Sequence, residues 1–266
     1  MQLREKKKKL LQILEEYGEV ALAFSGGADS SLLLRCVVDS LEADSILVLT
    51  FKSCLLKQRE LDRVSTWFSR NTPQSSIKHE FVDLDPLAWK EFILNSEDRC
   101  YLCKKKVYQL FLEKAEKNGI HSLIDGTNAD DINSERPGLR ALRELQIGTP
   151  LADAGFSKEE VRALSKEMGL NTWDQPSSSC LATRIPHGLE ITGQRVEIVD
   201  RCESALLKMG FAGCRFRLDR FDPVAGYVQV QNQDIERLSR YEVRNKLLEI
   251  FNDYGMKHIF IDMNGR

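Results

Sequence analysis

An apolar run that leads into a glycine-rich turn constrains the fold of this chain more than any other feature. Residues 20–24 are wholly apolar, and residues 25–30 read Ser-Gly-Gly-Ala-Asp-Ser. A short apolar run is typical of a buried strand in a parallel sheet. A helix is expected from about residue 31 to residue 40. A strand, a glycine-rich turn and a helix in this order place the turn at the ligand-binding edge of an open α/β sheet.

The first 185 residues continue this alternation of strand and helix. Helices are expected at residues 3–17, 56–70 and 102–117, and strands at 45–50, 77–84 and 122–125. Such alternation favours a parallel sheet covered by helices on both faces. Near residue 186 the pattern changes, and a helix, short strands and further helical residues follow. We therefore predict an α/β domain at 1–185 and a smaller α+β domain at 186–266, which would serve substrate binding or oligomerisation.

Composition and charge narrow the classes of function. The 266 residues include 38 Lys and Arg against 40 Asp and Glu, a net charge of −2. This balance gives no overall attraction to nucleic acid. No apolar run is long enough for a membrane span, and the basic N-terminal residues do not form a signal peptide. We expect a cytoplasmic protein, in which the seven cysteines are reduced, catalytic or metal-bound rather than paired.

The glycine-rich turn predicts a phosphate site. Gly26 and Gly27 let the backbone approach an anion closely, and the following helix N-terminus offers unpaired N–H groups and a partial positive charge. Ser25 and Ser30 can donate hydroxyl hydrogen bonds. Asp29 would repel phosphate unless a cation bridged them, so it is a candidate Mg²⁺ ligand. The alternative is an ordinary glycine-rich turn capped by this aspartate.

A second polar loop, residues 125–131, closes the predicted strand 122–125 at the same edge of the sheet. Within it, Thr127 and Asn128 are candidate nucleotide-binding residues. Asp130 and Asp131 are adjacent carboxylates, which are costly unless they are solvated or bound to a cation. We expect them to help hold Mg²⁺, although one of them could instead cap the next turn.

Two pairs of arginines are candidates for binding anions. Arg136 and Arg140 flank a Pro-Gly-Leu segment just after the second loop. Arg215 and Arg217 lie two residues apart in a predicted strand, so both can face one side. Guanidinium groups suit phosphate and carboxylate because they form two parallel hydrogen bonds. The alternative for each pair is an exposed surface position.

Three cysteines suggest a metal cluster. Cys100 and Cys103 form a C-x-x-C pair at the start of a predicted helix, which can bring both sulfurs to one side. A redox pair is the alternative. Cys180 is the third candidate. Three cysteines do not complete a structural zinc site, but they can hold a [4Fe–4S] cluster with one iron open. The remaining cysteines lie in or near apolar segments and are expected in the core: Cys36, Cys54, Cys202 and Cys214.

Four stretches together resemble a known family. They are residues 25–30, 99–105 (Arg-Cys-Tyr-Leu-Cys-Lys-Lys), 125–139, and 179–188 (Ser-Cys-Leu-Ala-Thr-Arg-Ile-Pro-His-Gly). The first is similar to the loop of the PP-loop ATP pyrophosphatases, which split ATP into AMP and pyrophosphate. The combination resembles the LarE family of ATP-dependent sulfur transferases, which build the nickel-pincer cofactor of lactate racemase. The resemblance implies that a carboxylate of a pyridinium dicarboxylate mononucleotide is adenylated and then converted to a thiocarboxylate.

The family has two sulfur sources, and the resemblance favours one of them here. One branch sacrifices a cysteine at the position where this chain has Ser179, with Cys180 one residue later. The other branch carries a C-x-x-C pair and a later cysteine that resemble three cluster ligands. We therefore prefer a [4Fe–4S] cluster on Cys100, Cys103 and Cys180, whose open iron would carry the sulfur. A sacrificial Cys180 is the alternative.

The resemblance also implies roles for arginines and an assembly. Arg184 matches a family arginine beside the cysteine segment and is expected to bind substrate, while Arg215 and Arg217 match arginines for the substrate phosphate. Asp29, Ser30 and Cys180 are the expected catalytic residues. Relatives form hexamers, so we expect a homo-oligomer. Three other functions fit the PP-loop: tRNA thiolation, amide formation by a ligase, and nucleotide binding without turnover.

Overall fold

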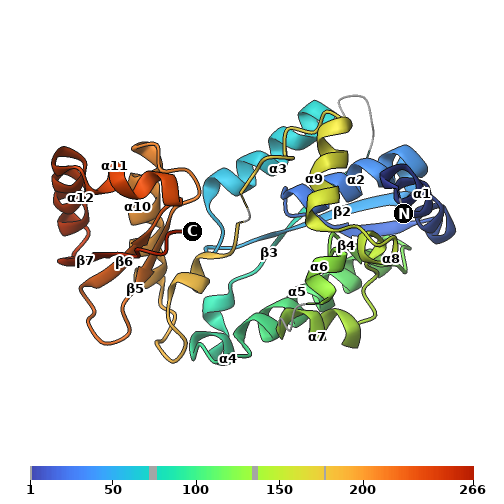
Figure 1. Cartoon of the computed structure of the whole chain (residues 1–266). Helices are drawn as coiled ribbons and strands as arrows, with labels where there is room; N and C mark the ends of the chain where they lie inside the picture. The colour runs from blue at the N-terminus through green and yellow to red at the C-terminus, as the bar shows by residue number, and fades with distance from the viewer. Residues whose placement is uncertain (1, 72–76, 134–136, 177) are drawn as a thin grey trace. The chain divides into compact units, whose positions relative to one another are not determined.

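The computed structural model describes residues 2–71, 77–133, 137–176 and 178–266 (Figure 1). It contains two compact units. Unit 1 consists of Met1–Ser53, Gln58–Leu84 and Asp98–Gln175. Unit 2 consists of Cys54–Lys57, Asp85–Glu97 and Pro176–Arg266. Each unit has its own sheet and is described separately below.

Unit 1 is built on a parallel sheet. Its four strands lie in the order β3-β2-β1-β4. The strands are β1 (Val20–Ala23), β2 (Ile46–Lys52), β3 (Lys78–Asp83) and β4 (Leu123–Asp125). The helices are α1 (Leu3–Tyr17), α2 (Ala28–Ser40), η1 (Ala43–Ser45), α3 (Gln58–Asn71), α5 (Arg99–Lys117), α6 (Ala129–Ile132), α7 (Pro137–Glu144), α8 (Pro150–Asp153) and α9 (Lys158–Glu167).

Helices cover both faces of this sheet. On one face α1, α2, α3 and α9 pack against the apolar side chains of β1 and β2, including Leu22 and Val48 (Figure 1). On the other face α5 and α7 cover Ala21 and Leu47 of the same strands. Both faces of β1 are therefore buried, which explains why its sequence is continuously apolar rather than alternating.

The strand order reverses between β1 and β4. In an open α/β sheet, ligands bind beyond the carboxyl ends of the strands at such a reversal. Residues 24–27 leave β1 at this point, and residues 126–128 leave β4 beside them. The fold thus brings the two polar loops of the sequence analysis to one place.

Unit 2 is a small α+β unit. Its sheet has the order β5-β6-β7, antiparallel between β5 and β6 and parallel between β6 and β7. Helices α10 and α12 pack on the buried face, where the ring centroids of Phe216 and Phe251 lie 5.2 Å apart. The elements are η2 (Pro86–Ala88), α4 (Lys90–Ile93), η3 (Leu181–Arg184), α10 (Gly193–Lys208), β5 (Arg215–Leu218), β6 (Ala225–Gln229), η4 (Asn232–Asp234), α11 (Ile235–Ser239), α12 (Tyr241–Asp253) and β7 (His258–Ile261).

Two short segments from the first half of the chain belong to unit 2. The Leu55 carbonyl accepts a hydrogen bond from the Leu181 N–H at 2.9 Å. The buried Asn95 side chain donates to the carbonyls of Pro186 and Leu189 at 2.7 and 2.6 Å. These long-range bonds cannot be seen in the linear order of the sequence. A functional division at residue 186 stays a prediction.

The structure confirms the fold class, an α/β unit with a parallel sheet and a smaller α+β unit. It also corrects helix boundaries. Helix α2 begins at Ala28 rather than near residue 31, so Asp29 and Ser30 lie in its first turn. Helix α9 is not among the predicted helices, although Ser157 and Glu160 form a capping box at its start. Among the described helices, none is both long and apolar enough to cross a membrane.

Candidate active site

The glycine-rich turn connects β1 directly to the N-terminus of α2. Gly26 has a φ of +68°, a conformation that residues with a side chain rarely adopt. A Cβ there would also lie 3.1 Å from the Val64 Cγ2 atom. Gly27 is the N-cap of α2, and no side chain caps this helix. The first N–H groups of α2 are therefore available to an anion.

Two serines line this turn. Their hydroxyl oxygens, Ser25 Oγ and Ser30 Oγ, lie 3.1 Å apart. The Gly27 N–H donates to Ser25 Oγ at 3.4 Å, and the Ser30 hydroxyl donates to the Gly27 carbonyl at 3.3 Å. Ser25 is exposed whereas Ser30 is buried. The two hydroxyls hold the turn closed and add donors next to the helix N-terminus.

The second loop packs closely against the first. A Cβ on Gly126 would lie 2.8 Å from the Ser30 backbone nitrogen, so only glycine allows this approach. The fully buried Asn128 donates from Nδ2 to the Asp29 Oδ1 atom at 2.8 Å. Its own Oδ1 accepts from the Asp131 N–H at 3.0 Å and caps α6. Asn128 thus joins the two loops and orients the Asp29 carboxylate.

The strand end below the second loop is fixed by Asp125. One of its carboxylate oxygens accepts from the Thr127 N–H at 2.9 Å. The other accepts from the Tyr108 hydroxyl at 2.7 Å and from the Lys104 ammonium at 3.3 Å. Both of these donors lie on α5, the helix that begins with the cysteine pair. Helix α5 is therefore tied to the strand end that carries the second loop.

The adjacent carboxylates of the second loop both contact Lys158, the first residue of α9. The Lys158 N–H donates to Asp130 Oδ2 at 2.8 Å, and its ammonium lies 2.8 Å from Asp131 Oδ1. Burial and the nearby Asp131 raise the pKa of Asp29, against the opposing effects of Asn128 and Lys158. A carboxylate in such a place gains stability when a cation approaches it.

The described residues contain no group of three or more His, Cys, Asp or Glu side chains arranged to hold a metal ion. Asp29 and Asp131 nevertheless supply carboxylate oxygens, the donors that Mg²⁺ prefers. They would form a complete site only together with phosphate oxygens and water. Their position beside the helix N-terminus fits that arrangement, whereas Asp130 is exposed and accepts from the first N–H of α9.

The cysteine pair begins α5 in unit 1. Cys100 is exposed and Cys103 is partly buried against the apolar cluster of that sheet face. Residues three apart on a helix are neighbours on its surface, so the pair fits as two ligands of one group. Beside it, the Arg140 guanidinium lies 3.5 Å from the ring centroid of Tyr101 and 3.2 Å from Asp98. Arg140 is therefore engaged with α5, and Arg136 lies outside the described residues.

The four cysteines outside the proposed set do not all lie in the core. Cys36, Cys202 and Cys214 are buried, as expected from their apolar neighbours. The expectation is wrong for Cys54, which is exposed. Its segment is a turn between β2 and α3 rather than part of either element, so its apolar neighbours in the sequence do not carry it inward.

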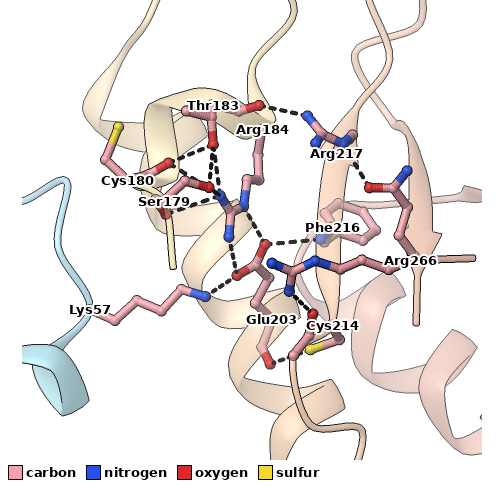
Figure 2. Close-up of polar contacts among 12 residues, drawn as sticks. Lys57, Ser179, Cys180, Thr183, Arg184, Glu203, Cys214, Phe216, Arg217 and Arg266 are labelled. Carbon is pink, nitrogen blue, oxygen red and sulfur yellow. Dashed lines mark hydrogen bonds and ion pairs between the residues drawn. The ribbon is translucent and has the colours of Figure 1, made fainter. Parts of the chain in front are cut away.

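Cys180 lies in unit 2, in a segment whose backbone is held by several hydrogen bonds (Figure 2). Its carbonyl accepts from the Thr183 N–H at 3.0 Å and from the Thr183 hydroxyl at 2.8 Å. The Cys180 sulfur points away from the Arg184 guanidinium, whereas the Ser179 hydroxyl accepts from Arg184 Nη1 at 2.6 Å. These neighbouring side chains therefore have different surroundings, and the serine is part of the scaffold.

Arg184 is a buried scaffold residue in this structure, with 3% of its surface exposed. Nη1 donates to the Ser179 carbonyl at 3.0 Å, to the Cys180 carbonyl at 3.3 Å and to the Thr183 hydroxyl at 2.7 Å. Nε and Nη2 donate to the Glu203 carboxylate at 2.7 and 3.3 Å. The guanidinium holds the cysteine segment in place. A direct contact between Arg184 and substrate stays a prediction.

Glu203 of α10 is the centre of this arrangement and is 1% exposed (Figure 2). Besides Arg184, it accepts from the Phe216 N–H at 3.0 Å and from the buried Lys57 ammonium. Burial by itself would raise the pKa of Glu203, but the two cations more than offset this and lower it. We call Lys57, Arg184 and Glu203 the carboxylate clip. It joins α10 to the cysteine segment and to the segment before α3.

The two arginines of β5 lie on one face of the strand, as their spacing predicts. Arg217 donates from Nε to Gln229 at 2.9 Å and from Nη1 to the Thr183 carbonyl at 2.7 Å. Burial, together with Arg266, Arg184 and Arg217, lowers the pKa of Arg215 to about 10. Both guanidiniums thus lie among other cations, which suits them to bind an anion.

Sequence reasoning missed three residues of these sites. Lys158 had no signal of its own. Lys57 lies far from Glu203 in the sequence, and no spacing rule joins them. Glu203 itself could have been found, because it follows Val196 and Val199 on the apolar face of a predicted helix. A carboxylate on a buried helix face needs a cationic partner.

Comparison with known proteins shows which chains this one is similar to. No family model matches the chain. It is 29% identical to an uncharacterized protein of Synechocystis sp., over 99% of this chain and 95% of that one. It is also 29% identical to the pyridinium-3,5-bisthiocarboxylic acid mononucleotide synthase of Lactiplantibacillus plantarum, over 99% and 92% of the two chains.

A further relative matches a smaller share of the chain. One of the subunits of the glutamine-hydrolyzing GMP synthase of Thermoplasma acidophilum is 31% identical, over 71% of this chain and 66% of its own. The PP-loop, the strand reversal and the paired loops of unit 1 agree with this relationship, and the similarity to the mononucleotide synthase extends through unit 2 as well. The chain therefore resembles the LarE family of ATP-dependent sulfur transferases over nearly its whole length, within the PP-loop ATP pyrophosphatase superfamily.

Proposed function

We propose that this chain uses ATP to activate a carboxylate of a pyridinium dicarboxylate mononucleotide and converts it to a thiocarboxylate. The observation that carries the proposal is the similarity to the mononucleotide synthase named above, which covers 99% of this chain. Unit 1 supports the ATP-dependent half, because its two polar loops meet at a helix N-terminus. Unit 2 supports the substrate half, because arginines gather beside the segment that carries Cys180.

The first step joins the substrate to AMP. The N–H groups of α2 and the hydroxyls of Ser25 and Ser30 would bind the phosphates of ATP, with Thr127 and Asn128 lining the second side. A substrate carboxylate oxygen attacks the α-phosphorus, the bond from this phosphorus to the bridging β-phosphate oxygen breaks, and pyrophosphate leaves. Lys158 lies beside Asp131, and its ammonium group would neutralise part of the negative charge of the pyrophosphate. The contribution of the protein is positioning and neutralisation of charge.

Magnesium would be held by Asp29 and Asp131. Asn128 already orients the Asp29 carboxylate, and Asp131 lies close enough to Asp29 to raise its pKa. A bound Mg²⁺ would screen the phosphate charges that these carboxylates otherwise repel. Asp130 is the weaker candidate, since its carboxylate already accepts from the start of α9.

The second step introduces sulfur. Sulfur attacks the carbonyl carbon of the acyl-adenylate, the bond from this carbon to the AMP oxygen breaks, and AMP leaves with the bonding electrons. We propose that Cys100, Cys103 and Cys180 hold a [4Fe–4S] cluster, since three soft thiolate ligands suit iron and leave one iron open. When bound, the cluster would supply the sulfur. In the alternative, Cys180 supplies its own sulfur and is consumed.

Unit 2 would bind the other end of the substrate. Arg215 and Arg217 would bind the phosphate of the mononucleotide through paired hydrogen bonds. The carboxylate clip would hold the Cys180 segment at a fixed place relative to these arginines. Assembly into a homo-oligomer, a hexamer by resemblance, completes the proposal.

Iron and acid-labile sulfide in protein purified without oxygen test the sulfur source. About four of each per chain are expected for one [4Fe–4S] cluster. Serine in place of Cys100, Cys103 or Cys180 should each remove them, whereas Cys54→Ser should not, because Cys54 is the exposed cysteine outside the proposed set. Absence of iron with loss of the Cys180 sulfur after turnover would establish the sacrificial route. Absence of iron with an intact Cys180 and no thiocarboxylate would overturn the proposal.

A further inference from the structure

The side chain of Arg266 extends into the arginine cluster of unit 2. Figure 2 shows it beside Glu203 and Cys214. Its Nη1 donates to the Gly213 carbonyl. Gly213 has a φ of +70°, and a Cβ there would lie 3.4 Å from this same Nη1 atom. The turn at Gly213 therefore both binds the guanidinium and leaves room for it.

The chain leading to Arg266 is held firmly. The Asp262 N–H donates to the Val228 carbonyl at 3.0 Å, which continues the pairing of β7 with β6. The Gly265 N–H donates to the Asp262 carbonyl at 3.1 Å and closes a turn. A Cβ on Gly265 would lie 1.9 Å from the Asn232 Oδ1 atom, so this turn packs directly on η4. The position of Arg266 is thus set by the fold of unit 2.

Positive charge gathers around Arg215, which lies two residues after Gly213. Burial, Arg266, Arg184 and Arg217 lower the pKa of Arg215, and Glu203 opposes them. Asp262 is a second carboxylate near these arginines, since Arg217 contributes to lowering its pKa. Glu203 already accepts from both Arg184 and Lys57. Within the described part of the chain, the buried Arg215 Nε has no hydrogen-bond partner. Partly buried cations and an unpaired donor are costly, and an anion would relieve both costs.

We infer that Arg266 is a third guanidinium of the anion site formed by Arg215 and Arg217, and that it contacts the substrate phosphate. The identity of that substrate rests on the proposed function. Three guanidiniums around one subsite favour a phosphate monoester dianion over a neutral nucleoside, because each contributes charge and directed donors. Arg266 is accordingly a residue that selects the phosphorylated form of the substrate.

Titration with inorganic phosphate tests this inference without any turnover. The PP-loop is first saturated with α,β-methylene-ATP, so that phosphate reports on unit 2. Arg266→Gln and Arg215→Gln should each weaken phosphate binding by about tenfold or more, as expected for loss of a charged hydrogen bond. Arg244→Gln is the matched control, because Arg244 is an exposed arginine of the same unit. It should bind phosphate like the unsubstituted chain.

A purely structural role for Arg266 gives a different result. Loss of an anchor to Gly213 would lower the melting temperature without phosphate and leave the phosphate-induced rise unchanged. The inference requires the opposite, a reduced rise with phosphate. Normal phosphate binding by Arg266→Gln with weak binding by Arg215→Gln would overturn the role of Arg266 alone. Normal phosphate binding by both variants and by Arg217→Gln would show that these arginines form no anion site. The proposed binding of the mononucleotide phosphate in unit 2 would then be wrong as well.

Discussion

The two units differ in the donors that they would offer to a phosphate group. In unit 1 the donors are backbone N–H groups and small hydroxyls at a helix N-terminus, and the nearby acidic side chains call for a cation. In unit 2 the donors are guanidiniums, and one buried carboxylate offsets part of their charge. The first site needs glycines where chains approach closely, and the second needs long side chains from distant segments. Consequently they should respond differently to the same kind of substitution.

The largest expected effect is on unit 2. Glu203→Gln leaves Lys57 and Arg184 as buried cations without their carboxylate, which costs about 3–5 kcal/mol in the free energy of unfolding. Denaturant unfolding followed by a probe in unit 2 measures this loss. The substitution should also slow sulfur transfer, since Arg184 would no longer hold the Cys180 segment in place.

The control for this variant lies on the same helix. Glu197→Gln removes an exposed partner of Arg201 and should change stability by less than about 1 kcal/mol. Acid provides a second check. Because the folded-state pKa of Glu203 is lowered, its contribution is complete above its ordinary pKa and is lost as the pH falls through the lowered value. Glu203→Gln should therefore lose less stability on acidification than the unsubstituted chain. If the two chains lost stability equally, Glu203 would not stabilise the fold through the carboxylate clip.

The next largest effect is on the chemistry of unit 1. Asp29→Ala should reduce pyrophosphate release by about 10²–10³-fold, because a group that neutralises phosphate charge is lost. The fold should remain intact, since burial raises the pKa of Asp29 and makes its charged form costly. Asp39→Ala on the same helix is the control, as Asp39 forms only an exposed pair with Arg35. Undiminished release by Asp29→Ala would exclude Asp29 from the metal site.

The smallest effect concerns the contact between the two loops of unit 1. Gly126→Ala would push a methyl group against the Ser30 backbone nitrogen, and overpacking of this kind costs about 1–3 kcal/mol. ATP affinity, measured by titration, should fall by about tenfold. Gly193→Ala is the control, because its Cβ would lie 3.9 Å from Leu87, an ordinary contact. Equal ATP affinities for the two variants would show that the loops need not touch.

The difference between the units also explains what sequence analysis recovered. The PP-loop is a run of consecutive residues, and its strand and helix have clear patterns, so its place and chemistry follow from local rules. The C-x-x-C pair and the spacing of Arg215 and Arg217 could also be recognised from neighbouring residues alone. By contrast, the carboxylate clip joins residues up to 146 positions apart, and no periodicity connects Lys57 with Glu203.

Arg184 illustrates the limit for single residues. Its type and its place beside Cys180 suggested a substrate ligand, and nothing in the sequence shows that Glu203 and the 179–183 segment surround its guanidinium. The same guanidinium can bind a ligand or hold a loop, because both uses satisfy its donors. The packing of α10 against this segment shows the scaffold contacts of Arg184, and a contact with substrate stays a prediction.

The sequence by itself determined the α/β class, the PP-loop and the family resemblance, because hydrophobic periodicity and turn chemistry act over neighbouring residues. The tertiary structure decided which loops meet at the reversal between β1 and β4. It also decided that Lys158 joins the acidic loop and that the Arg266 guanidinium bonds the Gly213 carbonyl before β5. Contacts of this kind depend on how whole elements pack, since burial and charge compensation are properties of the assembled fold.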